Sequence, residues 1–288
     1  KGAENLRKDI SKKISDFKSK IEKKAKRQKK SGNTLNIKKE GAGQVVILGL
    51  ANSGKSTFLS SFTNSKPLIA PYPYSTTKPE IGALNYGGAM IQLVEVPAFL
   101  ESKEMSGQMF SIIRCADAIV FVVRDYAAIT ELDKLIALLE AQDIFVTRKK
   151  PNITLSKSQY PGVTFVNEQN LLAPKEQAIA LLRDSGFRNI TLILGQKTDL
   201  PTLLLLLNPR AVFLPATSVV MPFSGYKKYP EEYKGIRLFQ LANGKDITES
   251  IFKMVNKIVV YTKKPGQKVA DLSDPLVLEK GATVKDAA

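Results

Sequence analysis

The sequence predicts an α/β fold, a mostly parallel sheet with helices on both faces, from three observations. Apolar runs that read as buried strands alternate with amphipathic helical patterns. A glycine-rich signature from Gly49 to Thr57 lies between one such strand and one such helix. Hydrophobic residues make up 43% of the 288 residues, which is enough for one good-sized core with small appendages.

The glycine-rich stretch satisfies every position of the G-x-x-x-x-G-K-[ST] pattern of a phosphate-binding loop. Val45–Leu48 before it reads as a buried strand, and Thr57–Phe62 after it opens a helix. Glycines let the backbone approach phosphates, and the N–H groups of the loop and helix N-terminus hold the anion. Lys55 is expected to reach the β and γ oxygens, and Ser56 to ligate Mg²⁺. A glycine-rich turn without a ligand is the alternative.

We therefore expect the loop to bind the phosphates of a nucleotide. The residues expected to do so are Gly49, Asn52, Ser53, Gly54, Lys55, Ser56 and Thr57.

The composition excludes several kinds of chemistry. The chain has no histidine, so Ser-His and Cys-His catalysis and imidazole metal sites are impossible. The single cysteine, Cys115, falls in the apolar stretch Ile112–Val123 and is expected to be a small core residue. The longest apolar run, Leu203–Leu207, is too short to span a membrane, and no signal segment leads the chain. A cytoplasmic protein is expected.

Positive charge is concentrated at the start of the chain. Residues 1–40 hold 15 Lys and Arg against 5 Asp and Glu, which is +10 of the net +16. Apolar residues recur there every three or four positions, so a basic helix with one narrow apolar stripe is predicted. Such a helix suits contact with RNA or the ribosome. A solvated helix that aids solubility and contact with an anionic membrane surface are the alternatives.

The remaining elements follow in a recognisable order. Glu40–Gly43 leads into the first strand, and Ile81–Tyr86 with Ala89–Val94 reads as a hairpin that turns at Gly87-Gly88. Ala118–Val123 reads as a strand and Ile129–Ala141 as an amphipathic helix.

The alternation then breaks. A β excursion up to Val166 and a helix over Pro174–Gly186 predict an inserted subdomain at about residues 145–205. A last strand, Ile236–Leu241, and a helix, Ile247–Val255, close the sheet. We expect three parts: a basic N-terminal segment at 1–40, a nucleotide-binding domain at 41–257 and a separate module at 258–288.

Four segments together resemble the developmentally regulated GTP-binding (DRG) proteins, which are relatives of the Obg GTPases. They are the phosphate loop, Tyr72-Pro73-Tyr74-Ser75-Thr76, the pair Lys150–Ile153 with Gly162–Phe165, and Tyr261–Gln267 with Lys280–Val284. The resemblance implies a Ras-like GTPase domain with an inserted α+β subdomain and part of a C-terminal TGS domain, a β-grasp module. It also implies a longer protein trimmed at both ends.

The resemblance implies further roles. Thr76 would sense Mg²⁺ and the γ-phosphate, and Glu95 would stand where the family has an aspartate that holds Mg²⁺ through a water. Ala98 would stand where a glycine N–H follows the γ-phosphate, and the following Phe99 where Ras-like enzymes carry a glutamine. Asn52 would place K⁺, or would serve the turn itself. Because Glu95 and Ala98 depart from the family pattern, slow or absent hydrolysis is expected.

The guanine-recognition motif is the second departure. Gln196-Lys197-Thr198-Asp199 nearly matches N-K-x-D, yet the alignment implied by the resemblance places that motif at Met221–Ser224, where no carboxylate lies. Asp199 is then either a coincidental match or a working base reader. The backbone of Leu241-Ala242-Asn243 would meet the base, with Ala242 in contact with it.

Two functions follow from the resemblance. The first is a Mg²⁺-dependent GTP- and GDP-binding protein that hydrolyses GTP slowly and acts on the ribosome or ribosomal RNA, with a family-type stabilising protein partner. The second is a non-hydrolysing adaptor or hibernation-type factor on the ribosome, without guanine selectivity. An ATP-binding switch is a third reading of the same missing motif.

Overall fold

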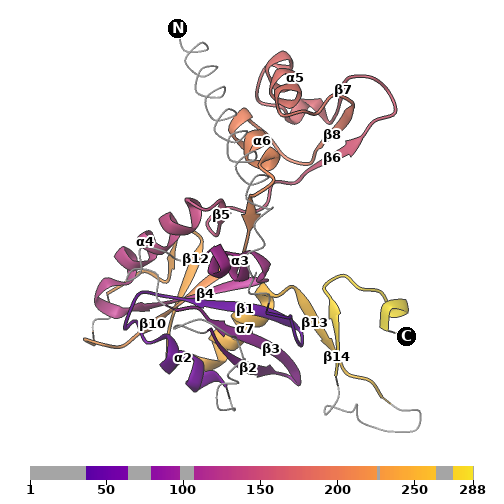
Figure 1. Ribbon diagram of the computed structural model, residues 1–288. Coiled ribbons are helices and arrows are strands. Elements are labelled where there is room, and N and C mark those ends of the chain that lie inside the picture. Colours follow the sequence, from indigo (N-terminus) through magenta and orange to yellow (C-terminus); the bar gives the residue numbers. More distant parts are fainter. Residues whose placement is uncertain (1–36, 64–78, 98–106, 226–227, 264–274, 288) are drawn as a thin grey trace. The chain divides into compact units, whose positions relative to one another are not determined.

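A computed structural model describes residues 37–63, 79–97, 107–225, 228–263 and 275–287 (Figure 1). The predicted basic helix, the segment Tyr72–Thr76 and Ala98 with Phe99 lie outside these residues. The chain divides into two compact units, one containing Lys150–Ala211 and the other containing Thr34–Lys149 with Val212–Ala288. We call them the inserted unit and the main unit and describe each by itself.

A seven-stranded mixed sheet in the order β11-β12-β10-β4-β1-β3-β2 forms the centre of the main unit. Four strand pairings in the centre of the sheet are parallel: β3 with β1, β1 with β4, β4 with β10 and β10 with β12. The edge strands β2 and β11 pair antiparallel with their neighbours. The strands are β1 Gly43–Leu48, β2 Glu80–Tyr86, β3 Ala89–Glu95, β4 Ala118–Arg124, β10 Ala216–Met221, β11 Glu232–Tyr233 and β12 Ile236–Gln240. The predicted hairpin and parallel strands are present.

Helices cover both faces of this sheet, as Figure 1 shows. The helices are α2 Lys55–Phe62, α3 Gly107–Cys115, α4 Ala128–Glu140 and α7 Gly244–Met254. Neighbouring residues of β1 alternate between two cores: Val46 packs with α3 and α4, and Ile47 packs with α2 and α7. Successive side chains of each buried strand therefore pack against helices on opposite faces of the sheet. Parallel sheets are normally stabilised in this way.

Two small strand pairs complete the main unit. The parallel pair consists of β5 Ile144–Phe145 and β9 Val212–Phe213, and the antiparallel pair of β13 Lys257–Val260 and β14 Leu276–Glu279. Val259 and Val277 pack against the core that holds α2 and α7. The Tyr261 hydroxyl donates to the Gly87 carbonyl at 2.8 Å, so the start of the segment at 258–288 is attached to the β2–β3 hairpin.

The inserted unit is a three-stranded sheet, β6-β8-β7, with two helices. Its elements are β6 Ile153–Lys157, β7 Val163–Val166, α5 Lys175–Asp184, β8 Ile190–Leu194 and α6 Leu200–Leu207. Within the leucine run, Leu203 and Leu204 are buried in this unit's own core.

The expectation for Cys115 was wrong, because this residue is exposed. The apolar stretch Ile112–Val123 is two elements: α3 ends at Cys115, and β4 begins at Ala118. Ile112 and Ile113 face the core from the helix, whereas Cys115 is its last residue and is exposed.

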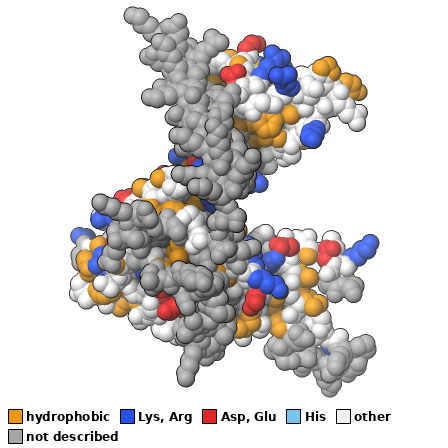
Figure 2. Space-filling model, in the orientation of Figure 1, with side chains coloured by type: hydrophobic (Ala, Val, Ile, Leu, Met, Phe, Trp, Pro, Cys, Tyr) orange, Lys and Arg blue, Asp and Glu red, His pale blue; other side chains and the backbone are white. Residues whose placement is uncertain are grey.

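Acidic and basic side chains are interspersed on the described surface that Figure 2 shows. Among the described residues, no helix is long and apolar enough to cross a membrane.

Candidate functional site

The phosphate loop joins the carboxyl end of β1 to the first turn of α2, as the sequence predicts. Gly49 needs to be glycine because a β-carbon there would lie 2.4 Å from the Ser53 Oγ and 2.5 Å from the Val122 carbonyl oxygen. Gly54, with a φ of +93°, has the left-handed backbone that favours glycine. The loop is thus tightly packed against the end of β4.

Lys55 folds back over this loop. It is buried, with 6% of its surface exposed, and its Nζ donates to the carbonyl oxygens of Leu50 at 3.0 Å and Gly49 at 3.3 Å. Burial lowers the pKa of Lys55, and the nearby charge of Glu95 opposes that shift. An ammonium group held in this way is available to exchange its carbonyl partners for the oxygens of a phosphate.

Ser56 and Glu95 meet beside the loop. The Ser56 hydroxyl donates to the Glu95 Oε1 at 3.0 Å, since the parallel register of β1 and β3 sets Glu95 level with Ile47. Glu95 is 9% exposed, and its Oε2 has no hydrogen-bond partner within the described part of the chain. Burial raises the pKa of Glu95, against the opposing effects of the Ser56 hydrogen bond and the Lys55 charge.

The other predicted loop residues fall into two groups. The Ser53 hydroxyl is buried and, among the described residues, has no hydrogen-bond partner. Asn52 is exposed with a φ of +57°, so its backbone serves the turn, and Thr57 is exposed in the first turn of α2. Thr76 and Ala98 lie outside the described residues.

Strands β10 and β12 end at the same edge of the sheet as β1, because β1, β4, β10 and β12 are parallel. Met221 at the end of β10 is buried, and a β-carbon at Gly54 would lie 2.9 Å from its Cε. The end of β10 therefore lies against the phosphate loop through an apolar contact, and the next loop starts beside it. Its residues Met221–Ser224 include no carboxylate.

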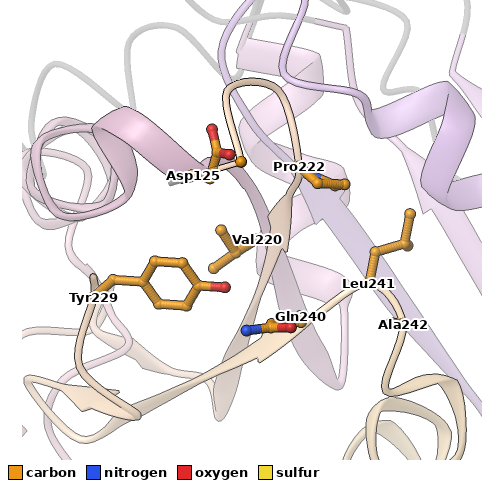
Figure 3. Close-up of a pocket in the computed structure, with 8 residues that line it drawn as sticks. Asp125, Val220, Pro222, Tyr229, Gln240, Leu241 and Ala242 are labelled. Carbon is orange, nitrogen blue, oxygen red and sulfur yellow. The ribbon is translucent and has the colours of Figure 1, made fainter. Parts of the chain in front are cut away.

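A pocket opens at the carboxyl ends of β10 and β12 (Figure 3). It holds about 390 Å³ of empty space, part of which is open to solvent. We call it the edge pocket; it is lined by Asp125, Val220, Pro222, Gly225, Tyr229, Gln240, Leu241 and Ala242. The sequence prediction placed Ala242, Leu241 and Pro222 near the base and missed the others, although Asp125 directly follows β4.

Asp125 anchors the loop after β10. Its carboxylate accepts the Ser224 N–H at 3.0 Å, the Ser224 hydroxyl at 3.1 Å and the Tyr126 N–H at 2.8 Å. Burial alone would raise the pKa of Asp125, but the hydrogen bonds from Ser224, Tyr126 and Phe223 outweigh it and lower this pKa. The carboxylate is thus ionised and already engaged by the protein.

Asp199 has a structural partner of its own. It follows β8 of the inserted unit and is the N-cap of α6, where its carboxylate accepts the Thr202 N–H at 2.9 Å. No strand of the seven-stranded sheet leads into it. Of the two readings of Gln196–Asp199, this environment favours a coincidental match.

The described residues contain no group of three or more Cys, Asp or Glu side chains that could hold a metal ion alone. A cation at this edge would therefore need ligands from the phosphates as well as from Ser56 and Glu95.

The chain is similar to several known proteins. A family model described as a 50S ribosome-binding GTPase matches residues 44–157. The chain is 26% identical to an uncharacterized GTP-binding protein of Halobacterium salinarum over 89% of this chain and 74% of that protein. It is 25% identical to Developmentally-regulated GTP-binding protein 2 of Homo sapiens, over 95% of this chain and 78% of that protein. The G domain of the T. maritima FeoB iron transporter, a solved structure, covers 74% of this chain at 14% identity with a TM-score of 0.42, and 98% of its own length is matched.

Proposed function

We propose that this chain, a divergent relative of the developmentally regulated GTP-binding proteins, binds GTP and GDP with Mg²⁺ and turns GTP over slowly. One observation carries the proposal: Lys55, Ser56 and Glu95 converge on the phosphate loop of a GTPase-type domain. The resemblance that the sequence predicted is confirmed by relatives of 25–27% identity over about nine-tenths of the chain.

Mg²⁺ suits the residues beside the loop. The Ser56 hydroxyl and the unpartnered Glu95 Oε2 are hard oxygen ligands, which Mg²⁺ prefers. When bound, the ion would neutralise charge on the phosphate oxygens. Lys55 would leave its two carbonyl partners for the phosphates, and the loop N–H groups would hold them in position.

Slow turnover rests on what replaces the family's aspartate and glycine. Glu95 has one more methylene than aspartate, and Ala98 has less backbone freedom than glycine. Asn52 is proposed as a K⁺ ligand only secondarily, because its left-handed backbone already accounts for an asparagine in this turn.

We further propose the ribosome or ribosomal RNA as the partner, in the cytoplasm, together with a family-type stabilising protein. The support is the charge of residues 1–40, which hold +10 of the net +16. The part of the chain from 258 onward is proposed as the start of a TGS module. Its described strands are β13 and β14.

The second candidate is a non-hydrolysing adaptor that binds nucleotide without guanine selectivity. It is favoured by one specific observation: Met221–Ser224 has no carboxylate, and the carboxylate of Asp125 nearby is engaged by Ser224. Phosphate release measured on nucleotide-saturated protein separates the two. Release above the rate of a Lys55→Ala control supports the slow GTPase, and its absence supports the adaptor.

The nucleotide-binding proposal is tested by calorimetric titration of GTP with Mg²⁺ against the wild type, Lys55→Ala and Lys134→Ala. Lys134 is an exposed lysine of α4 and serves as a matched control. We expect Lys55→Ala to weaken GTP binding by ~100-fold or more, because it removes a charged hydrogen-bond donor to phosphate. Lys134→Ala is expected to bind as the wild type does. Equal affinity of Lys55→Ala and wild type would refute the proposal.

The RNA proposal is tested by reversing four charges at the start of the chain. Changing Lys12, Lys13, Lys23 and Lys24 to Glu is expected to weaken binding to ribosomal RNA and to reduce its salt dependence. The matched control reverses four exposed lysines elsewhere: Lys134, Lys149, Lys197 and Lys245. If both sets weaken binding equally, net charge is responsible, and the localised contact is refuted.

A further inference from the structure

The phosphate loop contains a hydroxyl that is turned into the protein. Ser53 is 0% exposed, whereas its neighbour Asn52 is exposed. Ser53 lies between two residues with left-handed backbone, Asn52 with a φ of +57° and Gly54 with a φ of +93°. A side chain with no exposed surface cannot touch a ligand on the outer side of the loop. Any part that the Ser53 hydroxyl takes in nucleotide binding must therefore act through the loop itself.

This hydroxyl is packed against Gly49. A β-carbon at Gly49 would lie 2.4 Å from the Ser53 Oγ, 2.5 Å from the Val122 carbonyl oxygen and 3.2 Å from the Lys55 Cγ. Within the described residues the hydroxyl has no hydrogen-bond partner. A buried hydroxyl without a partner is unfavourable, because it has lost its hydrogen bonds to water and has gained none from the protein. The free protein thus holds an unused donor beside the first residue of the loop.

Lys55 occupies the carbonyl groups next to this donor. Its Nζ donates to the Leu50 carbonyl at 3.0 Å and to the Gly49 carbonyl at 3.3 Å. The Leu50 carbonyl also accepts the Ser53 N–H at 3.2 Å. For the Gly49 carbonyl, Lys55 is the only donor in the described part of the chain. When Lys55 moves to a phosphate, as proposed above, Leu50 keeps a hydrogen-bond partner and Gly49 does not.

We propose that Ser53 is a positioning residue for nucleotide binding, whose hydroxyl donates to the Gly49 carbonyl once Lys55 has moved to the phosphates. The exchange satisfies two groups at once: the hydroxyl that the free protein leaves unpaired and the carbonyl that Lys55 vacates. One buried hydrogen bond therefore favours the nucleotide-bound loop over the free loop. This inference rests on the proposed nucleotide binding and adds a residue that acts on the loop rather than on the ligand.

Ser218 offers a matched control in the same sheet. Its side chain is also 0% exposed, and its Oγ likewise lacks a hydrogen-bond partner among the residues described. Ser218 lies in β10 two positions before Val220, so both side chains point to the same face of the sheet. Val220 packs in the core that holds α3 and α4, whereas α2 lies on the other face. Removing the Ser218 hydroxyl should relieve the same cost in the free protein without touching the phosphate loop.

The test compares the wild type, Ser53→Ala and Ser218→Ala as whole chains. Calorimetric titration with GDP and Mg²⁺ measures affinity, and thermal unfolding without nucleotide measures stability. Both variants should melt at or above the temperature of the wild type, because each loses an unpaired buried hydroxyl. Ser53→Ala should bind GDP ~10-fold more weakly, the effect of one hydrogen bond, and Ser218→Ala should bind within ~2-fold of the wild type.

Weaker binding without loss of stability is the result that a merely structural serine would not give. Equal GDP affinity of Ser53→Ala and the wild type would overturn the inference and leave the proposed function intact. So would a lower melting temperature of Ser53→Ala, which would mean that its hydroxyl already stabilises the free protein. Equal weakening by both variants would also overturn it, since the effect would not belong to the loop. If the wild type itself does not bind GDP, the proposed function and this inference are refuted together.

Discussion

Two parts of the carboxyl edge of the seven-stranded sheet differ in the residues they carry. We call them the phosphate end, which comprises the phosphate loop and Glu95, and the base end, which comprises Met221–Ser224 and the edge pocket. At the phosphate end, Lys55 and Ser56 are the residue types that the proposed binding of phosphate and Mg²⁺ requires. Glu95 supplies a carboxylate beside them. At the base end, Met221–Ser224 carries no carboxylate, and the carboxylate of Asp125 accepts the Ser224 N–H. On the proposed nucleotide binding, the difference predicts that affinity resides in the phosphate end.

Met221 ends β10 and packs against Gly54. Its substitution is expected to have the largest effect on the free energy of unfolding. Met221→Ala would leave a cavity beside Gly54 and lower the free energy of unfolding by ~2 to 4 kcal/mol, because the side chain is 4% exposed. The affinity of Met221→Ala for nucleotide should also fall, because the phosphate loop loses this support. Chemical denaturation measures the first effect and calorimetry the second. Met90→Ala is the control, since Met90 is 42% exposed, and its change should stay below ~0.5 kcal/mol.

Gly49 tests the packing of the phosphate end alone. Gly49→Ala would push a β-carbon onto the Val122 carbonyl and lower the free energy of unfolding by ~1 to 3 kcal/mol. Because the phosphate loop must shift, GTP affinity should also fall. Gly107→Ala, whose β-carbon would meet nothing within 4 Å, should be neutral in both measurements. Full GTP affinity in Gly49→Ala would show that the loop geometry described here is not the binding geometry.

Substitution of Glu95 tests whether its buried, ionised carboxylate destabilises the protein when no ligand is bound. Since burial raises the pKa of Glu95 above its ordinary value of 4.5, the protonated form favours folding. That stability is present below 4.5 and is lost as the pH rises through the raised pKa. Glu95→Gln should therefore be ~1 kcal/mol more stable than the wild type at pH 8 without nucleotide, and this advantage should vanish towards pH 4.5.

The same variant should bind Mg²⁺-GDP ~10-fold more weakly, because it lacks the charged oxygen ligand. Thermal unfolding across pH measures the stability, and the exposed Glu231→Gln serves as the control. An advantage of Glu95→Gln that is independent of pH would contradict the explanation by charge burial.

The smallest effect is expected at Asp199. Asp199→Ala should leave GTP affinity within ~2-fold of the wild type and cost the inserted unit ~1 kcal/mol, the usual cost of losing an N-cap. Asp199→Asn keeps a capping side chain and should restore that stability. Loss of GTP binding with unchanged ATP binding in either variant would show that Asp199 reads the base, and the comparison between the two ends would fail.

The phosphate end could be predicted from the sequence because its residues are contiguous. The strand, the glycine loop and the helix over Val45–Phe62 follow one another in the chain, and only the start of α2, at Lys55, differed from the pattern. The partnership of Ser56 with Glu95 could be expected only from the family resemblance, since 39 residues separate them.

The base end could not be predicted in the same way. Asp125 and Ser224 are 99 residues apart, and the pairing of β4 with β10 brings them together. Nothing in the local pattern marks Tyr229 and Gln240 as residues that line the same pocket. Cys115 shows the opposite failure: a single apolar run concealed a helix end, a turn and a new strand, so local hydrophobicity alone misplaced its side chain.

The most direct test of the central claim compares GTP with guanosine as calorimetric titrants in the presence of Mg²⁺. If affinity resides in the phosphate end, GTP should bind at least ~1,000-fold more tightly than guanosine, because the nucleoside makes none of the charged contacts. Similar affinities for GTP and guanosine, or no heat from GTP, would contradict the account.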